Sequence, residues 1–594
     1  MLNLLSKTSK LCFLFFFALI IFLNKNMALA ASITWDANGS TAGQTDGLGA
    51  WLDIGRWWNG VANVNWTSGD DAIFGNGGTG GAVTLASPTT VNSLTINTFS
   101  GTYTLGSPTQ AVTLNNGITK NAGGTAATIV SPITLSAPQT WLNNSTGALS
   151  QNNTTNNGGN LLTIDGTGNV SFATAVGNVI SGAGGLTKNG SGYLTIGGGQ
   201  VPIHTYTGPT IINGGTVMQS SNNIPSGNIT LNGGVLESYW STPFIRSLGS
   251  GSNQIQIPGG ASGFSLNGNT GMSVTLNNNA ATEAVWGSTF FNPSTFVLQR
   301  PTSQSASAIT FANVMDLNGA VRTIEVSGGI LGNATANLSG IVRNTTGTSG
   351  LIKTGTGRLI LSAANTYNGD TTISGGILQI GNNTAGNLGG GNYAGNISIA
   401  SGSTLRIWGT GAQTLSGVVS VAGSVTKAYG NTLTLSGNNT YTGTTSIIPQ
   451  TTAGGTLSVS SFNSVNGGTP LMASSSMGAP TTIANGTIQI GSSGAQASNT
   501  LRYTGPGEIT DRVLHFFFNN TARQSLDASG TGLLKFTSNI AITPSSGNLT
   551  GGINFTGTGT GEIAGVIPTM PGTIQKTGTG IRGLSPVLIH MQML

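Results

Sequence analysis

The chain has 594 residues, of which only 6% are charged and 94 are glycine. Soluble proteins carry about 25% charged residues and about 7% glycine, yet 37% of this chain is hydrophobic, which argues against a disordered chain. The single cysteine excludes a disulfide framework, and the formal net charge of +5 comes without the clustered basic residues that nucleic-acid binding needs.

The first thirty residues have the pattern of a secretory signal peptide. Basic residues precede the apolar run 11–23, and the small residues Ala28 and Ala30 give the spacing of a cleavage site. A membrane anchor is the alternative, but this run is short for a span of about 20 residues. We predict cleavage after Ala30, which removes the cysteine and three lysines and leaves 17 basic against 15 acidic residues.

A tryptophan-rich block fills residues 31–80. Five of the nine tryptophans fall in it: Trp35, Trp51, Trp57, Trp58 and Trp66. We predict that they cap the open end of a repeat stack, whose first strand otherwise has an unpaired edge. The alternative is an exposed aromatic platform for sugar rings. Asp70 and Asp71 close the block, and we expect a turn there, because neighbouring strand residues point to opposite faces.

From residue 81 to 580, short runs of alternating apolar and small polar residues end at Gly, Asn or Ser. Runs such as Leu94/Ile96 have the period of two of a half-buried strand, and no window of eleven or more residues shows a helical period. We therefore predict an all-β solenoid of stacked repeats, with about 20–25 residues per coil. The less regular stretch 237–336 fits either a diverged part of the solenoid or an insertion.

A compound pattern occurs near residues 184–219, 349–380 and 424–459, and it begins again at 573–580. Each complete unit has a lysine before a turn and a strand, then a Tyr-x-Gly phrase and a second strand. The signature residues are Lys188, Tyr206 and Gly208, then Lys353, Tyr367 and Gly369, then Lys427, Tyr441 and Gly443. Because these residues recur in each unit, we expect them to have a structural role. We expect the lysines to protect strand edges and the tyrosines to stack or cap at turns.

These units resemble the autotransporter-associated β-strand repeat, also called the passenger-associated transport repeat. The match is closest in KTGTGRLIL, NTYNGDTT and GGIL, between Lys353 and Leu378. The first unit departs by placing His204 where the others have asparagine. The resemblance implies a right-handed parallel β-helix, exported to the surface or exterior of a Gram-negative-type cell. It marks passengers and does not imply any one activity.

The last unit starts as the others do and then loses the pattern after Gly580. Proteins with these repeats often end in an outer-membrane barrel or another sorting signal, and the tail 581–594 resembles neither. We expect that the reading frame is truncated or shifted at this point.

No catalytic, cofactor or metal site is predicted. The three histidines are scattered outside any recognisable motif: His204, His515 and His590. One later acidic group lies near two arginines: Glu508, Asp511 and Asp527, with Arg512 and Arg523. We interpret this group as a surface salt-bridge cluster. A carbohydrate-active cleft, which needs two facing carboxylates, is the less favoured alternative.

We therefore predict an exported, non-enzymatic structural or adhesive β-solenoid. Its expected partners are cell-surface or extracellular glycans or proteins, without nucleic acid and without a membrane span in the mature chain. The alternative is a polysaccharide-binding or polysaccharide-degrading β-helix. An enzyme would gather two or three carboxylates in a groove, whereas a scaffold scatters its acids along its length.

Overall fold

The computed structural model describes residues 30–172, 179–196, 204–219, 225–239, 243–268, 270–301, 307–327, 334–449, 453–494, 497–518, 521–544, 551–570, 572–580 and 582–584. These residues form an almost purely β structure, from β1 (Ser32–Trp35) to β60 (Arg582–Leu584), which confirms the predicted class. Short helical turns include α2 (Ile483–Gly486). The chain divides into two compact units, Met1–Gly208 and Pro209–Leu594, which we describe in turn.

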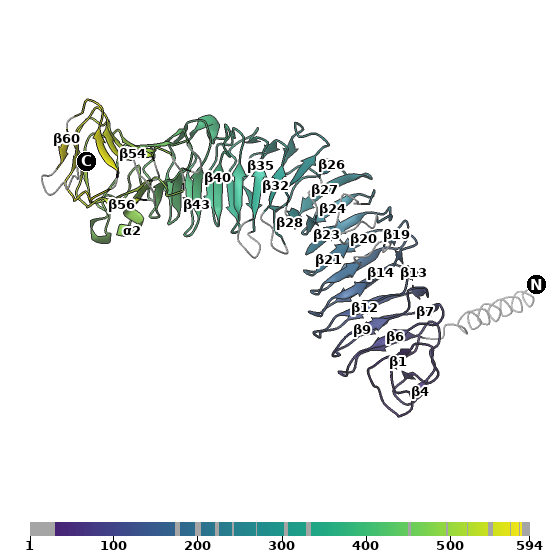
Figure 1. The fold of residues 1–594 in the computed structure, drawn as a ribbon. Coiled ribbons are helices and arrows are strands. Elements are labelled where there is room, and N and C mark those ends of the chain that lie inside the picture. The colour runs from purple at the N-terminus through teal and green to yellow at the C-terminus, as the bar shows by residue number, and fades with distance from the viewer. Residues whose placement is uncertain are drawn as a thin grey trace, which may run out of the picture. The chain divides into compact units, whose positions relative to one another are not determined.

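In the first unit, short strands stack in parallel ladders, each strand pairing with its equivalent one coil earlier (Figure 1). One ladder consists of β7 (Thr89–Val91), β10 (Val112–Leu114), β13 (Ile133–Leu135), β16 (Thr155–Asn156) and β19 (Ile180–Ser181). A second consists of β6 (Ala82–Thr84), β9 (Tyr103–Leu105), β12 (Ala127–Ile129), β15 (Leu149–Gln151), β18 (Val170–Phe172) and β21 (Tyr193–Ile196). Partners one coil apart, such as Thr89 and Val112, are 23 residues apart in sequence.

The third ladder of this unit starts from the tryptophan-rich coil. It runs through β5 (Asp71–Phe74), β8 (Leu94–Ile96), β11 (Gly117–Lys120), β14 (Gln139–Asn143), β17 (Leu162–Asp165) and β20 (Leu186–Lys188). At its first end β1 pairs in parallel with β5 but antiparallel with β3 (Trp57–Trp58), which pairs antiparallel with β4 (Asn63–Val64). The parallel stack therefore begins at a short antiparallel segment.

The second unit continues the same construction with three faces per coil (Figure 1). One ladder consists of β29 (Met272–Leu276), β32 (Ala308–Phe311), β35 (Thr335–Leu338), β38 (Arg358–Leu361), β40 (Ile377–Ile380), β43 (Thr404–Ile407), β46 (Ser424–Lys427), β48 (Thr445–Ile447), β50 (Ile488–Ile490), β53 (Leu514–Phe518) and β56 (Ala541–Pro544). Another consists of β23 (Thr216–Gln219), β25 (Val235–Ser238), β28 (Ala261–Leu266), β31 (Thr295–Leu298), β34 (Arg322–Glu325), β37 (Leu351–Thr354), β39 (Thr371–Ile373), β42 (Ile397–Ile399) and β45 (Val419–Ser420).

The remaining strands form shorter ladders that complete the coils. The first has β30 (Ala284–Val285), β33 (Met315–Asp316) and β36 (Val342–Arg343), and the next has β41 (Asn392–Tyr393), β44 (Gln413–Leu415), β47 (Thr432–Leu435), β49 (Thr456–Val459), β51 (Thr500–Tyr503), β54 (Arg523–Ala528), β57 (Gly552–Thr556) and β59 (Thr573–Lys576). A last ladder joins β52 (Glu508–Thr510), β55 (Leu534–Phe536), β58 (Gly561–Ile563) and β60.

The stretch 237–336 belongs to this stack, which resolves the alternative left open by the sequence. Its strands β25, β28, β31 and β34 pair in parallel with one another, and β34 pairs with β37 of the second repeat unit. The irregularity is local: the register between β24 (Ile229–Asn232) and β27 (Gln254–Gly259) shifts after Thr230. The stretch is therefore a diverged part of the solenoid.

Alternation along each strand builds the core. Leu359, Leu378, Leu405 and Val425 face one another on consecutive strands and are at most 1% exposed. Burying each such side chain contributes about 1.5–3 kcal/mol, so the stacked columns supply the main stabilising term. No helix in the described part of the chain is long and apolar enough to cross a membrane.

One coil carries extra residues between β49 and β50, residues 460–487, which we call the 460–487 segment. Thr445 pairs with Ile488, 43 positions later, whereas Val425 pairs with Thr445 only 20 positions later. Because β48 still pairs with β50, the ladder closes behind the segment and the register is kept. The segment includes α2, and its end is visible beside β56 in Figure 1.

Close stacking explains the glycine of the Tyr-x-Gly phrase. A Cβ on Gly443 would lie 2.1 Å from the carbonyl oxygen of Gly423 one coil earlier, and one on Gly369 would lie 2.6 Å from that of Ser349. A Cβ on Gly208 would lie 2.4 Å from the backbone of Gly184. In each case the nearest atom belongs to the backbone, so no side chain can turn away to make room for a Cβ. A larger residue at these positions would therefore require neighbouring coils to move apart.

We expect Gly443→Ala to lower the free energy of unfolding by about 1–3 kcal/mol, the usual cost of overpacking. Gly494→Ala is the matched control, because the nearest atom to its Cβ would be a serine hydroxyl at 3.7 Å. Urea denaturation followed by circular dichroism measures both. Equal stability of the two variants would contradict the stacking explanation.

Candidate functional site

The Asn-Thr-Tyr phrase of each unit binds the backbone of the preceding coil. Its first side chain accepts a hydrogen bond from a strand residue: Val342 N to Asn365 Oδ1 at 2.9 Å, Val419 N to Asn439 Oδ1 at 2.7 Å, and Ile180 N to His204 Nδ1 at 3.0 Å. The following threonine donates its backbone N–H to the same residue's carbonyl: Thr366 to Val342, Thr440 to Val419 and Thr205 to Ile180, each at 2.9 Å. We call this two-bond arrangement the coil clamp.

His204 therefore performs the role of the asparagine that it replaces. Its side chain is 5% exposed, and burial lowers its pKa to about 4. The ring is consequently neutral at pH 7, which leaves Nδ1 free to accept the Ile180 N–H. From sequence the residue looks like a departure from the repeat pattern. Its position one residue before Thr-Tyr is the signal that identifies its role.

The repeat tyrosines lie inside the coil. Tyr367 and Tyr441 have no exposed surface, and Tyr206 is 1% exposed. The hydroxyl of Tyr367 lies 2.9 Å from Thr371 Oγ1, and that of Tyr441 lies 2.7 Å from Thr445 Oγ1. Each threonine starts the next strand, so the Tyr-x-Gly-x-Thr spacing joins a corner of the coil to the strand that follows it.

The expectation that the repeat lysines protect strand edges is wrong. Lys188, Lys353 and Lys427 are at most 1% exposed, so they lie inside the coil. Their ammonium groups donate to backbone carbonyls at the end of each strand and in the turn after it, and that of Lys353 also donates to the turn of the next coil. Lys353 Nζ bonds Thr354 O at 3.0 Å, Gly355 O at 2.8 Å and Gly375 O at 2.8 Å. Lys188 bonds the carbonyls of Asn189 and Gly190, and Lys427 bonds that of Tyr429.

This geometry explains the Lys-x-Gly spacing. Gly355 and Gly190 have φ of 77° and 58°, a region that glycine adopts without strain. Burial lowers the pKa of Lys353 and Lys427 to about 7. Burial also lowers the pKa of Lys188, to about 8, and Asp165 opposes that shift. The lysines are interior hydrogen-bond donors that hold the turns.

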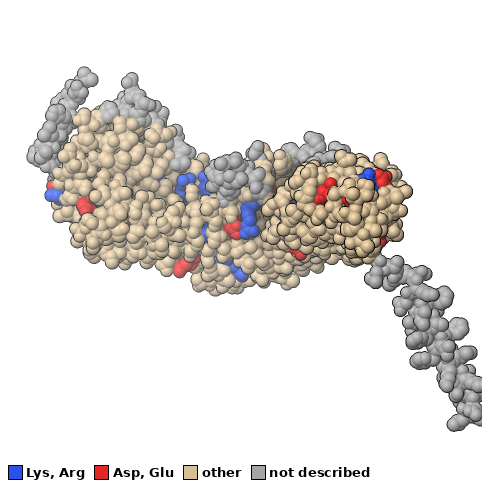
Figure 2. Space-filling view, turned by 90° about the horizontal axis from the view of Figure 1, so that it is seen from below, with Lys and Arg blue, Asp and Glu red and all other residues tan. Residues whose placement is uncertain are grey.

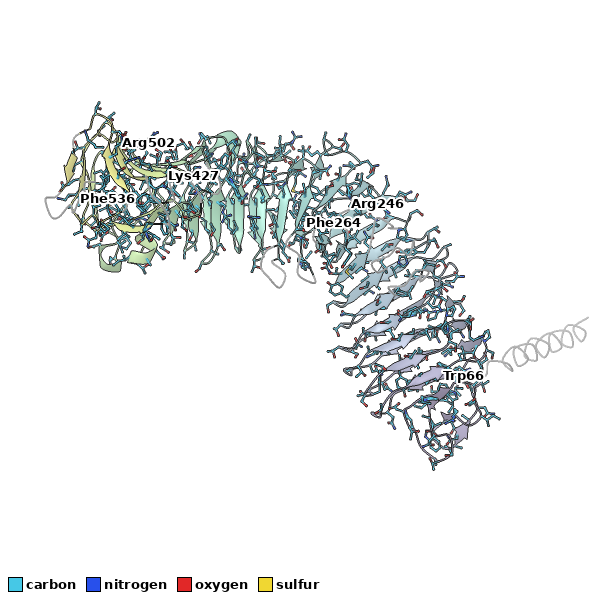
Figure 3. The ribbon with its side chains drawn as sticks, viewed as in Figure 1. Trp66, Arg246, Phe264, Lys427, Arg502 and Phe536 are labelled. Atoms are coloured by element: carbon cyan, nitrogen blue, oxygen red, sulfur yellow. The ribbon has the colours of Figure 1, made fainter. Side chains whose placement is uncertain are left out.

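The tryptophans of the first coil pack against one another. Trp35, Trp51 and Trp57 are at most 3% exposed, and Trp57 lies 5.6, 5.2 and 4.9 Å from the rings of Trp35, Trp51 and Trp66. Trp66, labelled in Figure 3, donates to Thr89 Oγ1 at 2.8 Å. These rings contribute to the interior and are unsuited to an exposed sugar-stacking platform. The residue range predicted for the cap remains a prediction.

Asp70 and Asp71 also have structural partners. Asp70 ends a turn and accepts from Ala31 N at 3.2 Å and Thr67 N at 3.1 Å. Asp71 begins β5 and accepts from Asn92 Nδ2 and Ser93 Oγ, both at 2.7 Å. The turn expected here is present, with Asp71 as the first strand residue after it.

The later acidic group is not the salt-bridge cluster that the sequence suggested. The carboxylate of Glu508 accepts from Phe462 N at 2.7 Å and Asn463 N at 2.6 Å, and that of Asp511 accepts from Val465 N at 2.6 Å and Asn466 N at 2.7 Å. Both carboxylates thus hold the 460–487 segment by its backbone. Asp527 pairs with Arg502 at 2.7 Å, and Arg523 donates to Thr573 Oγ1 at 2.9 Å.

Arg512 completes the attachment of the 460–487 segment. It is fully buried and donates to the carbonyls of Gly486, Phe462 and Met477 at 2.8, 2.9 and 3.0 Å. Burial lowers its pKa to about 10, so the guanidinium stays charged at neutral pH. The group gives no pair of facing carboxylates in a cleft, because its acids are bound to backbone or to an arginine.

Most of the described surface on the face shown in Figure 2 is uncharged. Asparagine ladders join neighbouring coils, with Asn116 donating to Asn92 at 3.0 Å and Asn121 to Asn97 at 2.7 Å. Among the described residues, ion pairs between neighbouring coils join Arg300 to Glu325, Arg502 to Asp527 and Lys535 to Glu562. Arg343 on β36 pairs with Glu283, which precedes β30 two strands earlier in the same ladder. Across the residues that the structure describes, no three His, Cys, Asp or Glu side chains gather into a metal site.

The remaining residues singled out from the sequence form no site in the described part of the chain. Ala28 and His590 lie outside the described residues, whereas Ala30 is the first described residue. His515 is half-buried on β53, and its Nε2 lies 2.8 Å from Thr543 Oγ1. Lys576 on β59 is exposed, unlike the lysines of the three complete units.

We expect Lys353→Met to lower the free energy of unfolding by about 2–4 kcal/mol, because three buried carbonyls lose their donor. Lys535→Met, which breaks the partly exposed ion pair with Glu562, is the control and should cost less than about 1 kcal/mol. Chemical denaturation at pH 7 measures both. A Lys353→Met variant as stable as the control would show that the carbonyl contacts contribute nothing.

His204 gives the fold a specific pH dependence. Between pH about 6.5 and 4, the unfolded chain binds a proton at His204 that the folded chain does not, so stability falls as the pH falls. The full loss is about 3 kcal/mol. His204→Asn keeps the acceptor and should remove this part of the slope, whereas His515→Asn should change it less. Unfolding curves at pH 7, 6, 5 and 4 test this; an unchanged slope in His204→Asn would refute it.

Comparison with known proteins agrees with this geometry. The passenger-associated-transport-repeat family model matches residues 186–218, 351–380 and 425–448. A curated relative, the Adhesin BmaC autotransporter of Brucella suis biovar 1 (strain 1330), is 28% identical over 485 residues. The alignment covers 71% of this chain but 13% of that relative, so the chain spans a small part of its length. No solved structure matches. The coil clamp is present in all three matched segments, so the chain carries three repeats that match the passenger-associated-transport-repeat family.

Proposed function

We propose that this chain is the adhesive part of an autotransporter-type passenger, exported to the exterior of a Gram-negative-type bacterium and without enzymatic activity. Its repeats match the passenger-associated family, and the curated relative is named an adhesin. A parallel solenoid suits this role, because each added coil extends the surface without a change in the core. The partners would be extracellular glycans or proteins.

One observation carries the non-enzymatic part of the proposal: the carboxylates of Glu508, Asp511 and Asp527 are all bound to other groups of the described structure. Glu508 and Asp511 bind backbone N–H groups of the 460–487 segment, and Asp527 pairs with Arg502. A glycosidase needs one carboxyl group free to donate a proton and a second to act as nucleophile or base. Carboxylates bound in this way are poor candidates for either role.

The export route is part of the same proposal. The basic, apolar and Ala28/Ala30 segments at the amino end have the order of a secretory signal. Cleavage after Ala30 would release the chain just before β1, which begins at Ser32. The mass of the exported protein would identify the cleavage site, and a product that retains residues 1–30 would refute this step.

Adhesion is tested with the exported full chain coupled to fluorescent beads. We expect beads carrying the chain to bind cultured animal cells or extracellular matrix above beads carrying albumin. The same protein should release no reducing sugar from a polysaccharide panel. Absence of adhesion would contradict the adhesive role, whereas sugar release that Asp511→Ala or Asp527→Ala abolishes would show an enzyme.

A further inference from the structure

The middle of the 460–487 segment forms an exposed loop, residues 467–474, which we call the 467–474 loop. The structure describes all of its residues, and none of them is buried or belongs to a strand. Leu471 and Met472 are 64% and 62% exposed. Exposed loops of small and polar residues are the places where proteases most readily cut folded proteins, so the accessibility of this loop to a protease follows from its position.

Hydrogen bonds to two neighbouring residues hold this exposed apolar pair in place. Asn463 accepts from Met472 N at 3.0 Å and donates to Met472 O at 2.6 Å. Leu471 N donates to Ser464 O at 3.3 Å. None of these bonds belongs to a strand ladder. The loop can therefore open locally, into the extended conformation that a protease active site needs, while the stack of coils stays intact.

The chain before the loop is bound by side chains that follow the loop in sequence. Glu508 and Asp511 each accept from two backbone N–H groups of residues 462–466. Arg512 donates to Phe462 O at 2.9 Å. The two partners of each bond lie on opposite sides of the loop, so these bonds would join the two fragments of a chain that is cut there.

The chain after the loop is bound by residues that precede the loop in sequence. Asn439 N donates to Ser475 O at 2.9 Å, and Ser475 N donates back to Asn439 O at 3.0 Å. The side chain of Asn439 donates to Ser476 O at 2.7 Å. Ala479 N donates to Tyr441 O at 2.9 Å. Both arms of the loop are thus attached to the opposite side of a cut.

Two strand ladders also cross the position of the loop. β48 pairs with β50, and β49 pairs with β51, so the strands before the loop bond directly to strands after it. Their inward side chains form one core, in which Leu457 and Leu501 are paired and have no exposed surface. Cutting the loop breaks none of these contacts. The two fragments would therefore stay together as neighbouring parts of one stack.

The residues around the loop indicate which class of protease fits it. No lysine, arginine, aspartate or glutamate occurs between Lys427 and Arg502. A protease that requires a charged residue beside the cut therefore has no site in this stretch. Leu471 and Met472 offer large apolar side chains that are exposed, whereas a large apolar neighbour such as Phe462 is buried. The loop therefore suits a protease whose pocket takes a large apolar side chain.

We propose that the 467–474 loop is a processing site for an extracellular endoprotease that selects large apolar residues. Hydrolysis breaks the peptide C–N bond after Leu471 or Met472 and adds one water molecule, which leaves a carboxylate on one fragment and an ammonium group on the other. Both new charges lie at exposed positions, where water solvates them. The two fragments remain one particle. The site does not depend on the adhesive role, because only export has to bring the chain to the protease.

Limited digestion of the folded, exported full chain with chymotrypsin, which cuts after large apolar and aromatic residues, tests this site. We expect a fragment that begins at Met472 or Ala473, identified by its mass and its amino-terminal sequence. Both fragments should elute together from a size-exclusion column at pH 7 and separate in urea. Trypsin is the control, because it has no cleavage site between Lys427 and Arg502. Absence of the expected fragment, or separation of the fragments without urea, would overturn the proposal.

Leu471→Ser/Met472→Ser should slow this cut at least about tenfold, because the side chain that fills the protease pocket is lost. Leu161→Ser, which changes another exposed leucine, is the matched control and should leave the rate unchanged. Asn463→Gly removes both bonds to Met472 and tolerates the φ of 64° found there. It should speed the cut, since cleavage follows the population of the open loop. A double variant cut as fast as the unaltered chain, or an Asn463→Gly chain cut no faster, would overturn the proposal.

Discussion

Every coil of this protein depends on its neighbours for backbone hydrogen bonds. In a parallel ladder the partners of a strand lie one coil away, so an isolated coil would leave its N–H and C=O groups unpaired. The coil clamp strengthens this dependence, because Asn365 and Asn439 bind the strand of the coil before. Gly443 permits the close approach that the pairing requires. Stability is thus a property of the stack.

In the interior, single cationic side chains donate hydrogen bonds to several backbone carbonyl groups. Turns leave backbone oxygens pointing inward, where water cannot reach them, and an ammonium or guanidinium group can satisfy several at once. Lys353 does this for a repeat turn, and Arg512 does it for the 460–487 segment, each with three carbonyl partners. Desolvation lowers the pKa of both. The same hydrogen bonding from a buried cation to several carbonyls therefore occurs at a position of the repeat, Lys353, and at a position outside the repeats, Arg512.

The sequence was sufficient to predict the all-β class and the resemblance of its repeats to the passenger-associated family, because alternation and spacing depend on local geometry. It misplaced the lysines: a charged residue beside a strand usually marks an edge, and only the stack shows that the Lys353 amine is enclosed by carbonyls. It also grouped Asp527 with Asp511, although Asp527 pairs with Arg502 on the preceding strand of its ladder.

The closure of the ladder behind the 460–487 segment has an evolutionary consequence. The bonds between β48 and β50 and between β49 and β51 do not use that segment, which is fastened instead by side chains around β52 and by bonds to Asn439 and Tyr441. The exposed residues of the segment, outside these attachments, can therefore change without altering the register of any coil. A lineage could diversify this projection rapidly, under selection by a host for example, while the framework beneath it stays constant.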